Sequence, residues 1–265
     1  MYAFDYRRPH SVNEVDLAMK AMPGAKLLAG GQTLIPTMKQ RLAQPENVID
    51  LGGIEELRKI SVSRSELVIG AMATHASVAE SADVKSVLPS LAALAEGIGD
   101  PHVRNRGTIG GSLANNDPAA DYPAAVLALG ATIHTSKREI AADVFFDGLF
   151  TTTLEDGEVI TRISFPVPAK FAYAKFANPA SRYALVGVAV AQRGDDVRVA
   201  VTGAGQDGVF RVPEMEAVLK GNFAANALNG ITVDAANLSS DIHADADYRA
   251  HLIGVMAKRA VSALA

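Results

Sequence analysis

Apolar residues in the first part of the chain alternate between helical spacing and short buried runs. A helical run follows Ser11 and Glu14, which have the spacing of a capping box, and Pro23-Gly24 ends it. Apolar runs at 26–29 and 47–51 each lead into two adjacent glycines, as expected for strands that end at turns. The pattern predicts a helix at 12–22, strands at 26–29, 47–51 and 67–71, and short helical pieces at 34–41, 54–60 and 75–80.

The middle of the chain combines one clear helix with one unusual segment. Residues 86–97 carry apolar side chains along one helical face, and Gly97 ends the pattern. The next segment, 98–123, is rich in Gly, Asn, Asp and Pro, and a loop of this length in a compact domain is uncommon unless it is functional. Further on we expect a helix from 124, a strand at 132–135, a short helix at 141–146, a strand at 158–165 and a boundary at 166–168.

From Phe171 onward the apolar period changes to two. The runs 171–176, 185–192 and 197–203 predict three antiparallel strands, with a hairpin turn at 193–196 between the last two. The remaining chain shows helical patches at 213–220, 222–228 and 246–264. These elements predict a C-terminal α+β domain.

Composition narrows the classes of function. The chain has 265 residues and a net charge of -4, which gives no support to nucleic-acid binding. It contains no cysteine, so it cannot hold an iron–sulfur cluster, a cysteine-ligated zinc or a thiol nucleophile. The first residues lack the apolar segment of a signal peptide, and no window approaches a membrane span. We therefore expect a cytoplasmic protein, with contact to the inner face of the membrane only through a partner.

Two glycine motifs carry the candidate chemistry. In both Ala29 to Thr33 (AGGQT) and Thr108 to Ser112 (TIGGS), two adjacent glycines come after apolar residues and are followed by a hydroxyl residue. Such turns can bring backbone N–H groups close to a phosphate. One of these turns alone is usually only a turn, but two in one chain suggest a single bound pyrophosphate. The segment from Lys26 onward does not read GxGxxG, so it carries no Rossmann fingerprint, and the absence of GxSxG gives a hydrolase little support.

Other polar residues have a functional and a structural interpretation. Asp121 follows the second motif closely enough to accept hydrogen bonds from a ribose, although an aspartate before an apolar helix is more often a helix cap. Arg104 and Arg106 could neutralise phosphate charge, but solvated surface arginines are the default. Scattered histidines such as His75 have no neighbours at metal-ligand spacing.

Three stretches together resemble a known family. AGGQTLIPTMKQR, DPHVRNRGTIGGSLANNDPAADYPAAVLALGA and KFANPASRYALVGVAV are similar to the FAD-binding medium subunit of molybdenum hydroxylases, which include the carbon monoxide dehydrogenase and xanthine dehydrogenase types. The resemblance implies an α+β protein: two α/β FAD-binding subdomains of the vanillyl-alcohol-oxidase type, then the C-terminal α+β domain with its three-stranded antiparallel sheet. We expect the parts at 1–55, 56–168 and 169–265.

The resemblance also implies which residues bind FAD. The first motif with its neighbours and the second motif would hold the pyrophosphate, while Asp121, Lys175 and an aromatic gate at Tyr183 would complete the site. Ile160 is a weaker candidate, on the strand beside the flavin ring. The implied residues are Leu28, Ala29, Gly30, Gly31, Gln32, Thr33, Leu34, Thr108, Ile109, Gly110, Gly111, Ser112, Asp121, Ile160, Lys175 and Tyr183.

The implied assembly is a dimer of heterotrimers. A large subunit would carry molybdopterin, a small subunit would carry two [2Fe–2S] clusters, and this chain would pass electrons from FAD to a quinone, NAD or oxygen. No residue of this chain need be an acid–base catalyst, and no metal site is expected in it. Two alternatives stay open: a stand-alone FAD-dependent oxidoreductase of the same fold, and a non-catalytic scaffold subunit that has lost FAD.

Overall fold

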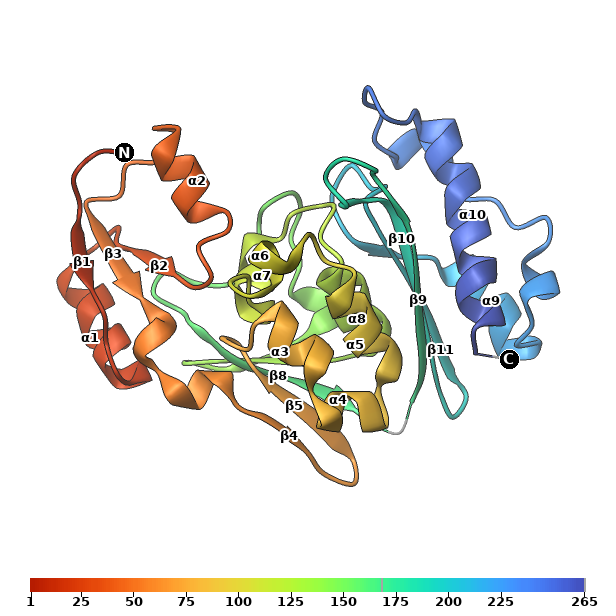
Figure 1. Ribbon diagram of the computed structural model, residues 1–265. Coiled ribbons are helices and arrows are strands. Elements are labelled where there is room, and N and C mark those ends of the chain that lie inside the picture. Colours follow the sequence, from red (N-terminus) through yellow and green to blue (C-terminus); the bar gives the residue numbers. More distant parts are fainter. Residues whose placement is uncertain (168, 265) are drawn as a thin grey trace.

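Three sheets follow one another along the chain in the computed structural model, which describes residues 1–167 and 169–264 (Figure 1). Pro168, at the predicted end of the second part, and Ala265, at the end of the third, lie outside the described residues. None of the helices within the described ranges is long and apolar enough to cross a membrane.

The first sheet is parallel and has the strand order β1-β3-β2. Ser11 caps the first helix, because its hydroxyl accepts the N–H of Glu14, and Glu14 in turn accepts the N–H of His10; the predicted capping box is confirmed with Glu14 reaching one residue further back. The elements are β1 (Asp5–Arg7), α1 (Val12–Ala21), β2 (Lys26–Leu28), α2 (Leu34–Lys39), β3 (Asn47–Asp50), η1 (Leu51–Gly53) and η2 (Glu55–Arg58).

The second sheet is antiparallel, with the order β4-β5-β8-β6-β7. Its strands are β4 (Ile60–Val62), β5 (Glu66–Gly70), β6 (Thr132–Thr135), β7 (Glu139–Ala141) and β8 (Ile160–Pro166). Helices between β5 and β6 gather on one side of this sheet (Figure 1). They are α3 (His75–Glu80), α4 (Ala82–Val87), α5 (Pro89–Glu96), α6 (Pro101–Arg104), α7 (Ile109–Asn115) and α8 (Tyr122–Ala128).

Several predicted elements of this region were wrong. The single helix at 86–97 is divided at Leu88, because Pro89 disfavours helical backbone in the residue before it and begins α5 itself. The predicted loop 98–123 contains α6 and α7. The short helical pieces predicted at 54–60 and 141–146 form only as the 3-10 helices η2 and η3 (Ala142–Val144). Strand β4 begins inside the first piece and β7 ends inside the second.

The third sheet is antiparallel and has the order β12-β11-β10-β9. The three predicted strands are present, with the hairpin at Gly194, and a two-residue fourth strand adds to them. The elements are β9 (Lys170–Ala177), β10 (Ala184–Arg193), β11 (Asp196–Thr202), β12 (Phe210–Arg211), α9 (Pro213–Gly221), η4 (Ala225–Leu228), η5 (Ala235–Asn237) and α10 (Ala246–Ser262). Of the helical patch predicted at 222–228, only the 3-10 helix η4 forms.

Strand alternation gives the third sheet two different faces. Even-numbered residues of β9, such as Ala172, pack under α9 and α10, while odd-numbered residues, such as Phe171, join the core around α5 and α8. The side toward α8 is lined by small residues, among them Ala189 and Ala200, so that α8, which is buried along its whole length, can approach closely (Figure 1). The predicted α+β class is confirmed, and the exact division at 55/56 and 168/169 stays a proposal.

Candidate functional site

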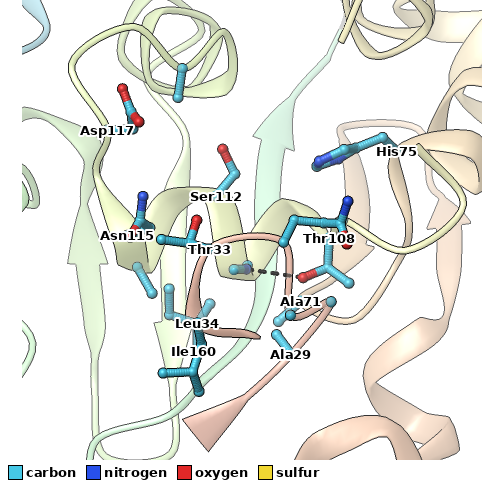
Figure 2. A pocket seen from close by; sticks show the side chains of 18 of the residues that line it. Ala29, Thr33, Leu34, Ala71, His75, Thr108, Ser112, Asn115, Asp117 and Ile160 are labelled. Carbon is cyan, nitrogen blue, oxygen red and sulfur yellow. Dashed lines mark hydrogen bonds between the residues drawn. The ribbon is translucent and has the colours of Figure 1, made fainter. Parts of the chain in front are cut away.

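A cavity of about 630 Å³ opens where the two glycine motifs meet the hairpin between β9 and β10. Figure 2 shows side chains of both motifs around it. Of the sixteen residues implied by the resemblance, thirteen line the cavity: Ala29, Gly30, Gly31, Gln32, Thr33, Leu34, Thr108, Gly110, Gly111, Ser112, Asp121, Ile160 and Tyr183. Leu28, Ile109 and Lys175 do not line it. The structure therefore brings together residues that lie up to 154 positions apart in the chain.

The first glycine motif lies between the end of β2 and the start of α2. Gly31 has a φ of +74°, in the left-handed region that favours glycine. The backbone N–H groups of residues 30–34 find no acceptor among the described residues. These five consecutive donors lie on a segment that lines the cavity. They can serve an anion, because consecutive free N–H groups in a turn form an anion-binding concavity.

The second glycine motif begins helix α7, although the sequence had suggested a turn. Thr108 caps the helix, and its Oγ1 accepts the N–H of Gly111 at 3.1 Å. The N–H groups of Ile109 and Gly110 donate to the carbonyls of Ala73 and Ala71, and that of Ser112 donates to Thr108. The expectation that both motifs offer the same free donors was therefore wrong. The second motif instead contributes to the cavity wall through its surface and through side chains such as the Ser112 hydroxyl.

The first motif packs closely against the second motif and against Arg106 and Gly107, the two residues that precede it. A Cβ on Gly30 would lie 2.1 Å from the carbonyl oxygen of Arg106 and 2.8 Å from the Cα of Gly107. A Cβ on Gly111 would lie 3.3 Å from the Cβ of Ala29. The close approach of the two backbones thus requires glycine at position 30 even in the protein without a ligand.

Asp121 stands at the N-cap position of α8 but its side chain makes no capping hydrogen bond, so the structural interpretation holds for its position and not for its carboxylate. Its buried carboxylate accepts the hydroxyl of Tyr173 at 2.5 Å and pairs with Lys175 Nζ at 3.0 Å. The same Nζ donates to the carbonyl of Gly97 at 2.9 Å. Burial raises the pKa of the Asp121 carboxyl, and Lys175 and Tyr173 oppose this by stabilising the carboxylate. Lys175 therefore acts on the cavity wall through Asp121.

Tyr183 stands half-exposed at the cavity, held by the hairpin loop between β9 and β10. The side chain of Asn178 accepts the N–H groups of Ala180 and Ser181, and Arg182 takes a left-handed φ of +62°. Strained backbone of this kind persists only where neighbours fix it. Burial, with the nearby carboxylate of Asp117, raises the pKa of the Tyr183 hydroxyl. Ile160 also lines the cavity, at the first position of β8, the strand predicted at 158–165.

The structure adds His75, which the sequence did not single out as a site residue. His75 lines the cavity at the start of α3, and its Nδ1 is buried without a partner among the described residues. Burial and nearby Arg104 lower its pKa to about 4, so the ring is neutral at pH 7. Arg104 and Arg106 are not among the lining residues; Arg104 instead donates to the carbonyls of Ile98 and Gly99. No sequence signal distinguishes His75 from an ordinary core histidine.

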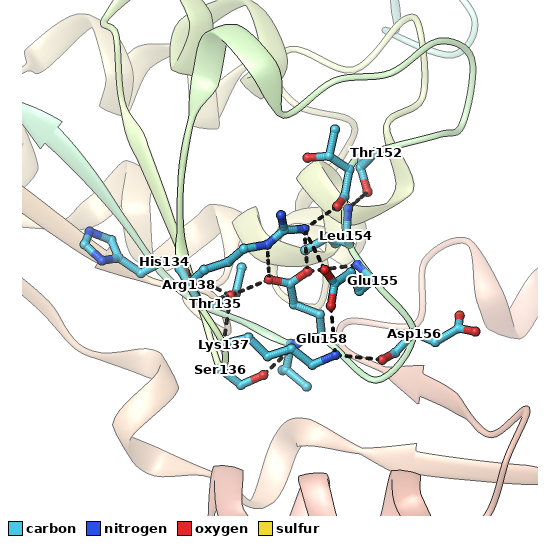
Figure 3. Close-up of polar contacts among 12 residues, drawn as sticks. His134, Thr135, Ser136, Lys137, Arg138, Thr152, Leu154, Glu155, Asp156 and Glu158 are labelled. Atoms are coloured by element: carbon cyan, nitrogen blue, oxygen red, sulfur yellow. Dashed lines mark hydrogen bonds and ion pairs between the residues drawn. The ribbon is translucent and has the colours of Figure 1, made fainter.

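Glu158 is a second addition, and a dense polar network holds it at the cavity wall (Figure 3). Its carboxylate accepts hydrogen bonds from Thr135 Oγ1 at 2.7 Å, Arg138 Nε at 3.0 Å and the N–H of Glu155 at 2.8 Å. Burial opposes ionisation, but these donors outweigh it and lower the pKa of Glu158 to about 2. The network fixes the segment that leads into Ile160.

Two family models match consecutive parts of the chain. Residues 2–168 match the FAD binding domain in molybdopterin dehydrogenase, and residues 171–264 match the CO dehydrogenase flavoprotein C-terminal domain. The chain belongs to this family of FAD-binding proteins. It is thus an oxidoreductase component with FAD as its cofactor, as the resemblance implied.

Individual relatives of this FAD-binding family align over nearly the full length. The carbon monoxide dehydrogenase medium chain of Hydrogenophaga pseudoflava is 38% identical, and the nicotine 6-hydroxylase medium subunit of Paenarthrobacter nicotinovorans 36%; each alignment covers 98% of this chain and 96% of the relative. The solved structure of reconstituted CO dehydrogenase from Oligotropha carboxidovorans superposes with a TM-score of 0.90 at 34% identity, covering 100% of this chain and 99% of that one.

The cavity of this FAD-binding chain fits a dinucleotide cofactor. Its volume lies within the range of ordinary cofactor pockets. The hydrogen-bond donors are also suitable. Arg104 and Arg106 do not line the cavity, but the free N–H groups of the first motif can bind phosphate oxygens. Apolar lining at Ile160 and Leu154 suits a planar ring system.

Proposed function

We propose that this chain is the electron-exit subunit of a multi-subunit molybdenum hydroxylase. It would accept electrons from [2Fe–2S] clusters on a partner subunit and pass them to an external acceptor. The single observation that supports it most is the run of unpaired N–H groups at residues 30–34, on the wall of a cavity in an FAD-binding family member. When bound, FAD supplies the redox chemistry, and this chain supplies binding and orientation.

Each group of site residues has a proposed role toward FAD. The segment from Leu28 to Leu34 would bind the pyrophosphate through its N–H groups, with Leu28 as a packing residue below it. The second motif, Thr108 to Ser112, would form the facing wall, with Ile109 anchoring α7 in the core, where it is fully buried. Asp121, supported by Lys175, would meet a hydroxyl of the cofactor. Ile160 and Tyr183 would border the flavin ring, Tyr183 as a gate.

The proposal of partner subunits rests on the absence of iron–sulfur ligands from this chain. With no cysteine, it cannot ligate an iron–sulfur cluster, so clusters must belong to another subunit. We propose a large molybdopterin subunit and a small [2Fe–2S] subunit in a dimer of heterotrimers, located in the cytoplasm. Relatives are named for carbon monoxide, nicotine and glyceraldehyde, so this subunit does not reveal the substrate. A quinone, NAD and oxygen all stay candidates for the acceptor.

A flavin titration of the purified full chain tests cofactor binding. FAD, FMN and riboflavin are titrated and followed by flavin fluorescence. If the N–H run at residues 30–34 holds the pyrophosphate, riboflavin should bind about 100-fold more weakly than FAD, since two or more charge-assisted hydrogen bonds are lost. Equal affinity for all three flavins would contradict the pyrophosphate assignment, and failure to bind any of them would favour the scaffold alternative.

Purification from the native host tests the assembly. Cysteine-rich and molybdopterin-binding chains should copurify with this chain in equal amounts, and their electrons should reduce its flavin. A chain that purifies alone with FAD and oxidises a substrate by itself would instead support the stand-alone oxidoreductase.

A further inference from the structure

The wall segment 117–121 is held by the C-terminal sheet. Asp117, Ala120 and Asp121 line the cavity, whereas Pro118 and Ala119 are not among its lining residues. Backbone and side-chain acceptors of this segment are bonded by residues more than 50 positions later in the chain. The position of this wall therefore depends on how the C-terminal domain docks.

The end of β11 supplies the first set of contacts. Thr202 is fully buried, and the single proton of its Oγ1 is shared between the carbonyls of Ala120 at 2.7 Å and Pro118 at 3.0 Å. The N–H of Gly203 donates to the same Pro118 carbonyl at 2.8 Å. Gly203 has a φ of +82°, and a Cβ there would lie 2.4 Å from the carbonyl oxygen of Ala184. The chain turn after β11 thus needs glycine to reach the wall segment.

Strand β9 supplies the second set of contacts. Tyr173 and Lys175 alternate on the face of β9 that points toward the FAD-binding part, and both bond Asp121. Gly187 on the neighbouring strand leaves room for Tyr173, because a Cβ at Gly187 would lie 2.1 Å from the Tyr173 hydroxyl oxygen. The sheet is thus shaped so that this hydroxyl can reach the wall.

We propose that Thr202 and Tyr173 are positioning residues, through which the C-terminal domain sets the cavity wall at 117–121 and so the affinity and environment of the flavin. Neither residue lines the cavity, so they act through Ala120 and Asp121 rather than by touching the cofactor. The inference rests on the proposed function, namely that this cavity binds FAD.

Three variants of the full chain test the proposal. Thr202→Val removes the hydroxyl at nearly constant volume, Thr202→Ser keeps it, and Tyr173→Phe removes one oxygen atom. The matched control is Tyr248→Phe, because Tyr248 lies on α10, across the sheet, and its hydroxyl has no partner within the described part of the chain. FAD affinity, the absorption spectrum of the bound flavin and thermal unfolding with and without FAD are measured for each.

Thr202→Val and Tyr173→Phe should each weaken FAD binding about tenfold and shift the spectrum of the bound flavin, the affinity loss being typical of one buried hydrogen bond. Thr202→Ser should restore both properties, and Tyr248→Phe should match the wild type. If Thr202→Val does not fold, Tyr173→Phe decides.

Two results would overturn the proposal while the proposed function stands. One is unchanged FAD affinity and spectrum in both hydroxyl-deletion variants. The other is an equal loss of stability with and without FAD, again with an unchanged spectrum, which would make the contacts merely structural. A wild-type chain that binds no FAD would instead contradict the proposed function itself, and the wild-type titration is therefore done first.

Discussion

Replacing Gly30 by alanine is expected to separate the two glycine motifs even when no cofactor is bound. The added Cβ would lie 2.1 Å from the carbonyl oxygen of Arg106, 2.7 Å from its carbonyl carbon and 2.8 Å from the Cα of Gly107. All three are backbone atoms, so no rotamer change relieves the contact. The backbones must move apart by more than about 1 Å to restore ordinary van der Waals distance.

The size of the effect follows from this forced movement. Overpacking a well-packed contact costs about 1–3 kcal/mol and occasionally more, and a clash with backbone belongs at the upper end. A loss of about 3 kcal/mol corresponds to a Tm lower by about 6–12 °C for a chain of this size. FAD affinity should fall as well, because residues 30–34 move away from the facing wall.

Thermal unfolding of Gly30→Ala without cofactor, followed by FAD titration, measures both effects. Gly254→Ala is the matched control, since Gly254 lies inside α10 with nothing within 4 Å of its added Cβ, and it should gain up to about 1 kcal/mol. If glycine is needed at position 30 only to admit a phosphate, the variant will lose FAD at an unchanged Tm. That result would refute the reasoning from motif contact.

Three further substitutions probe other parts of the site. Gly31→Ala should cost about 1–2 kcal/mol in urea unfolding, because its φ of +74° strains any residue with a Cβ; a wild-type midpoint would contradict this. Glu158→Gln should cost about 1–3 kcal/mol at pH 7. Because the folded-state pKa of Glu158 lies near 2, below its ordinary 4.5, this difference should vanish as the pH falls from 4.5 to 2, and a pH-independent difference would contradict the ionised role. Tyr183→Phe should keep FAD affinity but change the rate of flavin reduction in stopped-flow experiments, and an unchanged rate would remove the gate.

Sequence patterns predicted those elements whose structure depends on interactions between residues close together in the chain. The capping box at Ser11 and the hairpin at Gly194 depend on neighbours in sequence, and both formed as expected. Helix α7 was missed because two glycines lower its helix propensity, while packing of Gly110 against Ala71 and the cap at Thr108 stabilise it. The capping threonine was visible in the sequence, but the tertiary contact was not.

The site could be predicted only in part for a similar reason. Motif similarity named residues that line the cavity, yet it could not say which atoms were free. Tyr173 and Thr202 reach Asp121 and Ala120 across 52 and 82 residues, and no local pattern encodes such contacts. Lys175 illustrates the difference, since it was expected at the cofactor and lies instead behind Asp121.

The two glycine motifs carry similar residues but have different roles because they dock on different neighbours. The second motif packs against the segment that follows β5, where the carbonyls of Ala71 and Ala73 accept the N–H groups of Gly110 and Ile109. The first motif leaves its sheet after Leu28, and the N–H groups of residues 30–34 have no acceptor among the described residues. Whether a backbone N–H of a glycine motif is free therefore depends on the segment it packs against. The second motif presents no acceptor to the N–H groups of residues 30–34 and leaves a cavity in which a ligand can bind them. Binding energy for an anion is thus concentrated on residues 30–34, where substitution should affect cofactor affinity most.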